Sequence, residues 1–137
     1  MRAFIDTSTL LKKYKIEPKR DKFLKILEET TEVIVSPVTY IETICSIQRV
    51  CEESKLKKEH FLKIKEEIDL DFSYFLKIRL DETMERIAID LRQKYTLKSL
   101  DLIQLASAKT SQATIFLTSD IHLFKIFSKE LNNPVFV

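Results

Sequence analysis

Glycine is absent from this chain of 137 residues, whereas an average protein of this length has about ten. Loops that cradle phosphates or present a nucleophile need glycine where the backbone comes close to the ligand. Its absence therefore excludes the Walker phosphate loop, the GxGxxG dinucleotide turn and the GxSxG nucleophile elbow. Nucleotide-cofactor enzymes and serine hydrolases are poor candidates for the function.

Cysteines and long apolar runs are also scarce. The two cysteines, Cys45 and Cys51, fall in one predicted helix. Six residues turn them about 240° apart around the helix axis, so we expect buried free thiols and no disulfide. No apolar stretch approaches the roughly 20 residues of a membrane span, and no signal-peptide pattern follows Met1. These features favour a cytoplasmic protein without a membrane segment.

The residues that are present describe a soluble, heavily charged domain. Hydrophobic residues make up 45% of the chain and charged residues 32%, and the length suits one domain spanning 1–137. The net charge is only +2. This balance is compatible with a polyanionic partner but does not identify one, because nucleic-acid binders usually have a concentrated basic face.

Hydrophobic periodicity predicts strands that alternate with helices. The expected strands cover 2–5, 32–35, 75–79, 114–118 and 135–137. The expected helices cover 20–29, 37–53, 57–69, 84–95, 100–110 and 121–130, with Ser36 and Ser99 as N-caps of two of them. This order predicts a three-layer α/β/α fold with a mostly parallel central sheet of about five strands.

Four acidic residues stand where strands end or helices begin. Asp6 closes RAFI, Asp120 follows TIFLTS, Glu42 lies past VIVSPVT, and Asp101 is within KSLDLIQLASA. Side chains in these places converge beyond the carboxyl ends of a parallel sheet. Carboxylates gathered there repel one another unless a hard divalent cation neutralises them, so at least one should have a raised pKa without metal. The pattern indicates a metal-dependent enzyme.

The segments IDTSTLL, YIETI, SLDLIQLASA and LTSD, in this order, closely resemble a PIN domain, and most of all the VapC-type toxin ribonucleases of toxin–antitoxin modules. The likeness covers essentially the whole chain. It implies an endoribonuclease that uses Mg²⁺ or Mn²⁺ and leaves a 3′-hydroxyl and a 5′-phosphate. It also implies a homodimer and inhibition by a cognate protein antitoxin. The acidic pocket would consist of Asp6, Glu42, Asp101 and Asp120, with Ser8 and Thr118 as supporting hydroxyls.

Some features depart from that family or remain open. Gln104 stands where relatives often have histidine, the loop SQAT lacks a common glycine, and residues 55–72 support no residue-level transfer. Lys12 and Lys13 are candidates for contacting substrate phosphates, with a solvated helix face as the alternative. A phosphotransferase of the haloacid-dehalogenase kind is disfavoured because Ser8 replaces its second aspartate. A non-catalytic PIN-like module that binds RNA or protein is the remaining alternative.

Overall fold

A sheet of five parallel strands forms the centre of the computed structural model, which describes residues 1–137. Its strands are β1 (Arg2–Ile5), β2 (Glu32–Val35), β3 (Leu76–Lys77), β4 (Ile115–Thr118) and β5 (Pro134–Phe136). The strand order is β3-β2-β1-β4-β5, and every pair is parallel. The predicted α/β class is confirmed, and the sheet is entirely parallel.

Alternation along the strands divides the core into two layers. Phe4 of β1 faces one layer, where it joins buried side chains of α5, α6 and α7. Ala3 and Ile5 face the other layer, where they join Leu10 of α1 and Phe23 of α2. The helices concerned are α1 (Thr7–Leu10), α2 (Arg20–Glu28), α5 (Glu82–Lys94), α6 (Ser99–Thr110) and α7 (Ile121–Glu130). Helices thus cover both faces of the sheet, which gives the predicted three layers.

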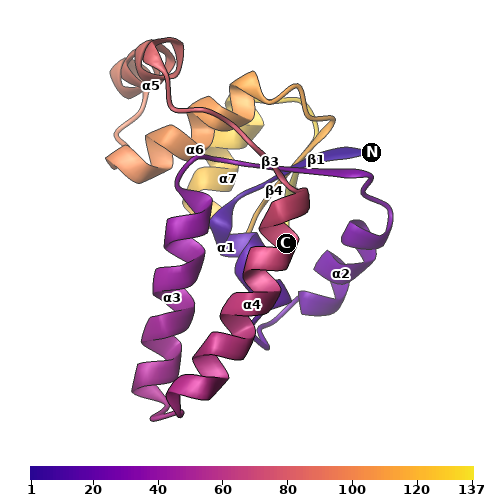
Figure 1. Ribbon diagram of the computed structural model, residues 1–137. Coiled ribbons are helices and arrows are strands. Elements are labelled where there is room, and N and C mark those ends of the chain that lie inside the picture. Colours follow the sequence, from indigo (N-terminus) through magenta and orange to yellow (C-terminus); the bar gives the residue numbers. More distant parts are fainter.

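The helices α3 (Thr39–Glu53) and α4 (Lys58–Tyr74) lie side by side and project away from the sheet (Figure 1). Ile47 and Cys51 of α3 pack with Ile68 of α4 and are buried.

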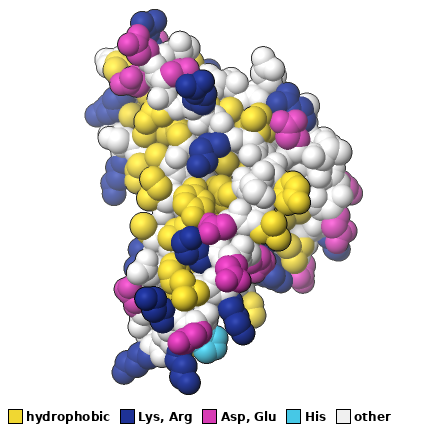
Figure 2. Space-filling model, in the orientation of Figure 1, with side chains coloured by type: hydrophobic (Ala, Val, Ile, Leu, Met, Phe, Trp, Pro, Cys, Tyr) yellow, Lys and Arg dark blue, Asp and Glu magenta, His cyan; other side chains and the backbone are white.

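Figure 2 shows the molecule from the same side as Figure 1, and basic and acidic side chains are dispersed over this face with hydrophobic side chains between them. No helix has both the length and the apolar character needed to cross a membrane.

Left-handed backbone positions, which glycine usually occupies, are filled here by Lys19, Lys55, Gln112 and Asn133. The end of α3 shows the consequence. The N–H of Lys55 donates to the carbonyl of Glu52 at 3.1 Å, and the N–H of Leu56 donates to that of Cys51 at 2.9 Å. This is a Schellman cap with lysine, at φ 55°, in the place that normally favours glycine.

The predicted strand 75–79 is present as β3 but is shorter than predicted. Helix α4 continues to Tyr74, and only Leu76 and Lys77 pair with β2. Phe75, the first residue of the predicted strand, packs at the end of the helix instead, and its ring centroid lies 5.0 Å from that of Phe72. Burial of this apolar cluster outweighs the β-propensity of its residues.

Two predicted helix starts and one predicted burial need correction. Ser36 does not cap α3, because its hydroxyl accepts a hydrogen bond from the N–H of Val38 at 3.2 Å and closes a turn before the helix begins. Ser99 is the first residue of α6, not its cap.

Cys45 is exposed and only Cys51 is buried, because the inner face of α3 carries Thr43 and Ile47. The short helix α1 and the 3₁₀ turn Leu11–Lys13 were not predicted.

Candidate functional site

The strand order places the candidate site at the point where the chain changes direction across the sheet. From β1 the chain moves to β2 on one side and later returns to β4 on the other, so the carboxyl ends of β1 and β4 flank a switch point where ligands bind in open α/β sheets. Asp6 follows β1, and its N–H donates to the carbonyl of Leu117 in β4 at 2.9 Å. Asp120 follows β4 and caps α7.

Glu42 and Asp101 come to the same place from two helices. Glu42 lies in the first turn of α3 and Asp101 in the first turn of α6, where the positive end of the helix dipole favours a carboxylate. With Asp6 and Asp120 they line one open cavity of about 370 Å³. The structure therefore brings together all four acids that the sequence selects.

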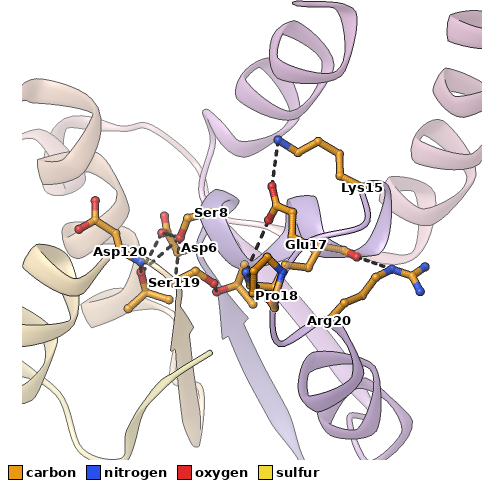
Figure 3. A network of polar contacts seen from close by, with 11 residues as sticks. Asp6, Ser8, Lys15, Glu17, Pro18, Arg20, Ser119 and Asp120 are labelled. Carbon is orange, nitrogen blue, oxygen red and sulfur yellow. Dashed lines mark hydrogen bonds and ion pairs between the residues drawn. The ribbon is translucent and has the colours of Figure 1, made fainter. Parts of the chain in front are cut away.

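Two hydroxyl side chains fix Asp6 beside the loop that carries Asp120. Ser8 Oγ and Thr118 Oγ1 both donate to Asp6 Oδ2, at 2.5 and 2.9 Å. The same hydroxyl oxygens accept backbone N–H groups of the loop, Ser8 from Ser119 at 3.0 Å and Thr118 from Asp120 at 3.1 Å. Figure 3 shows Asp6, Ser8, Ser119 and Asp120 clustered in this way. Ser8 therefore contacts the acid that it follows in the sequence, whereas Thr118 donates to the carboxylate of Asp6 and not to that of its sequence neighbour Asp120.

Two carboxyl groups of the cavity, those of Asp6 and Asp101, have pKa values above the ordinary value of aspartate. Burial is the main cause that raises the pKa of Asp6 to about 6, and the charges of Glu42 and Asp101 raise it further, against the two hydroxyl hydrogen bonds. The pKa of Asp101 is also raised, first by burial and then by the charges of Asp120 and Glu42. A raised pKa in at least one of the acids was predicted from like-charge repulsion. The rise is present in Asp6 and Asp101, but burial is its main cause and repulsion adds to it.

A buried polar network lies behind Glu42. Thr7 Oγ1 and Gln104 Nε2 both donate to Glu42 Oε1, at 2.8 and 2.9 Å. Gln104 Nε2 also lies 2.9 Å from Thr7 Oγ1 and 3.1 Å from Thr39 Oγ1. The sequence drew attention to Gln104 only as a departure from a family pattern, and nothing in its spacing indicates these contacts.

The donor set of the cavity fits a hard divalent cation that keeps part of its water shell. No three Asp, Glu, His or Cys side chains lie close enough together to ligate one ion directly. Mg²⁺ usually needs only one or two protein carboxylates, with waters and substrate phosphate as its other ligands. Asp120 uses Oδ1 for the N–H groups of His122 and Leu123, so the cap leaves its Oδ2 for such a role.

The structure does not favour the phosphate contacts predicted for Lys12 and Lys13. Lys12 is buried, and its ammonium group donates to the carbonyl of Pro18 at 3.0 Å and lies 3.5 Å from Glu17. Lys13 pairs with Asp71. Figure 3 shows Glu17 and Pro18 at some distance from Asp6 and Asp120. These lysines hold loop and helix segments together.

Arg49 is the basic side chain that lines the acidic cavity, and it is exposed. It lies on α3 at the seventh position after Glu42, with Cys45 and Ser46 between them on the same lining face. This i, i+3, i+4, i+7 spacing was available in the sequence, and it is the signal that would have identified Arg49.

Comparison with known proteins finds one family model and several solved structures that are similar to this chain. The PIN domain family model matches residues 3–129. No curated protein matches the chain. The chain is similar to FitAcB from Neisseria gonorrhoeae, with a TM-score of 0.73 at 16% identity over 98% of this chain and 96% of that one.

Two further solved structures show a comparable likeness. One is VapBC2 from Rickettsia felis bound to a DNA fragment from their promoter, with a TM-score of 0.67 at 17% identity over 98% of this chain and 99% of the other. The other is a toxin–antitoxin complex from Klebsiella pneumoniae, with a TM-score of 0.66 at 20% identity over 89% of each chain. At these identities the likeness establishes the fold.

Proposed function

The chain belongs to the PIN domain family, and we propose on this basis that it is a divalent-metal-dependent endoribonuclease. The observation that carries the proposal is the convergence of four carboxylates on one open cavity, with the pKa of Asp6 raised to about 6. Keeping such groups together without a cation is unfavourable, and a bound Mg²⁺ or Mn²⁺ would remove that cost.

The four acids have different tasks in this proposal. Asp6 and Asp101 would be the central metal ligands. Asp120 would complete the pocket or bind a second ion through its uncapped oxygen, and Glu42 would bind metal or position the attacking water through it. A cation held there would supply activation of the attacking water and stabilisation of the charge on the departing oxygen. Ser8 and Thr118 keep Asp6 oriented by donating to its Oδ2. The reaction is in-line hydrolysis of an RNA phosphodiester.

Substrate binding falls to Arg49 in this proposal. Its exposed guanidinium group borders the cavity and forms no ion pair with a carboxylate, so it can bind a phosphate of the RNA backbone. The net charge of +2, and the dispersed charge on the face that Figure 2 shows, predict modest, salt-sensitive affinity for RNA.

A protein antitoxin is the proposed partner, and a homodimer is the proposed assembly. The antitoxin proposal is supported by the similarity to structures described as a toxin–antitoxin complex, as VapBC2 and as FitAcB. A cytoplasmic location is part of the same proposal. The alternative function is a non-catalytic module that binds RNA or protein.

One experiment separates these functions. Purified wild type and Asp101→Asn are incubated with total RNA in Mg²⁺, Mn²⁺ or EDTA, after any co-purified inhibitor has been removed under denaturing conditions and the chain refolded. The proposal expects cleavage by the wild type only, and only with metal. RNA that binds without being cut in any condition would favour the binding module.

A further inference from the structure

The polar network behind Glu42 centres on Gln104, a residue of α6 that is 2% exposed. Its Nε2 lies within hydrogen-bond distance of Glu42, Thr7 and Thr39. Its Oε1 is the one buried side-chain nitrogen or oxygen in the chain that has no hydrogen-bond partner. An unpartnered buried acceptor is unfavourable, so its presence calls for a compensating interaction.

We propose that Gln104, with Thr7, is the positioning residue that holds Glu42 for catalysis. This inference rests on the proposed nuclease function and deepens it. Both donors end on the same carboxylate oxygen, Oε1, while Oε2 accepts no hydrogen bond from the chain. Because Glu42 lines the cavity, its unbonded oxygen is the one available to an ion or to the attacking water.

The orientation of the Gln104 amide follows from the charge of Glu42. With the amide reversed, Oε1 would face a carboxylate oxygen and repel it. The observed orientation directs N–H groups at the carboxylate and leaves Oε1 without a donor. A purely structural residue in this place would avoid that cost by being apolar. The amide is thus better explained by its contact with Glu42 than by packing.

The network also joins Glu42 to the sheet. Thr39 Oγ1 lies 3.2 Å from Thr7 Oγ1 and 2.9 Å from Ser36 Oγ, at the end of β2. Ser36 and Thr39 are fully buried. The Glu42 carboxylate is therefore held by segments that follow β1 and β2 and by α6, which keeps it in place before substrate arrives.

Isosteric variants test this role. Gln104→Met fills the same volume without donors, and Thr7→Val removes the second donor while Thr7→Ser keeps it. We expect Gln104→Met and Thr7→Val each to lower kcat about 10- to 100-fold, as loss of a hydrogen bond to a charged group implies, with KM for RNA nearly unchanged. Thr7→Ser should recover most of the rate lost in Thr7→Val. The Tm should stay within about 5 °C of the wild type.

A double-mutant cycle shows whether Gln104 acts through Glu42. In a Glu42→Gln background, Gln104→Met should cause no further loss of kcat. A full additional loss there, or wild-type kcat in both Gln104→Met and Thr7→Val, overturns the inference.

A crystal structure of Gln104→Met separates this inference from the proposed function. If the wild type is inactive, the nuclease proposal is refuted. The positioning role is then judged from the crystal structure alone: it is supported if the Glu42 carboxylate has moved in Gln104→Met, and it fails if the carboxylate has not moved.

Discussion

Replacing Asp6 by asparagine should stabilise the metal-free protein at neutral pH while removing its activity. Asp6 is 5% exposed, and burial raises its pKa from 3.8 to about 6. The folded chain therefore holds this proton more tightly than the unfolded chain does, and ionised Asp6 weakens the fold. Asparagine is neutral at every pH, and its carbonyl oxygen can accept the same hydrogen bonds from Ser8 and Thr118.

The size of the effect follows from the shift in pKa. A rise from 3.8 to about 6 is roughly 2 pH units, and each unit corresponds to about 1.4 kcal/mol, so the variant should gain up to about 3 kcal/mol. For a domain of this size that is roughly 10 °C in Tm. The gain is complete above about pH 7. It shrinks as the pH falls through 6 and disappears below about pH 4, where Asp6 is protonated in both folded and unfolded chains.

Urea unfolding of wild type and Asp6→Asn in EDTA, measured from pH 4 to pH 8, tests this reasoning. Thr118→Val is the matched control, since it removes a hydrogen bond to the same carboxylate without removing the charge, and it should be less stable than the wild type at neutral pH. A difference between wild type and Asp6→Asn that does not change with pH, or a variant less stable than the wild type at pH 8, would refute the account of Asp6.

Three further substitutions probe other parts of the structure. Lys12→Met should lower the free energy of unfolding by about 1–3 kcal/mol, because the Pro18 carbonyl loses its hydrogen-bond donor. It should leave KM for RNA unchanged, and urea unfolding and cleavage kinetics measure the two effects. Arg49→Ala should raise KM several-fold at unchanged kcat and weaken the dependence of KM on salt, whereas Arg49→Lys should retain that dependence. Lys55→Gly should raise the free energy of unfolding by about 0.5–1 kcal/mol, because glycine adopts φ 55° without strain. Calorimetry measures this, with Lys57→Gly as the control because the backbone of Lys57 is extended.

The sequence predicted the placement of the acids because that placement depends on features that act locally. Strand–helix alternation and short apolar runs are enough to bring the ends of β1 and β4 together, and Asp6 and Asp120 follow directly from those ends. Glu42 and Asp101 lie in the first turns of helices whose starts are within a few residues of the predicted ones.

The contacts that hold the acids could not be predicted in the same way. Gln104 meets Glu42 and Thr7 only because three segments distant in the chain converge, and no periodicity encodes that meeting. The lysines near Asp6 resemble a solvated helix face, yet the chain turns back at Pro18 and buries Lys12. The predicted strand 75–79 was too long, because Phe75 packs against Phe72 at the end of α4 and only Leu76 and Lys77 form the strand.

The most direct test of the central claim is the initial rate of cleavage of a defined RNA in Mn²⁺ by wild type and four single variants, with Tm measured for each. The variants are Asp6→Asn, Glu42→Gln, Asp101→Asn and Asp120→Asn. Four acids that form one metal-dependent site predict a loss of at least about 100-fold in every variant, with Tm of the metal-free protein equal to or above that of the wild type for Asp6→Asn and Asp101→Asn. Wild-type rates in any of the four, or a wild-type rate that does not change in EDTA, would contradict it.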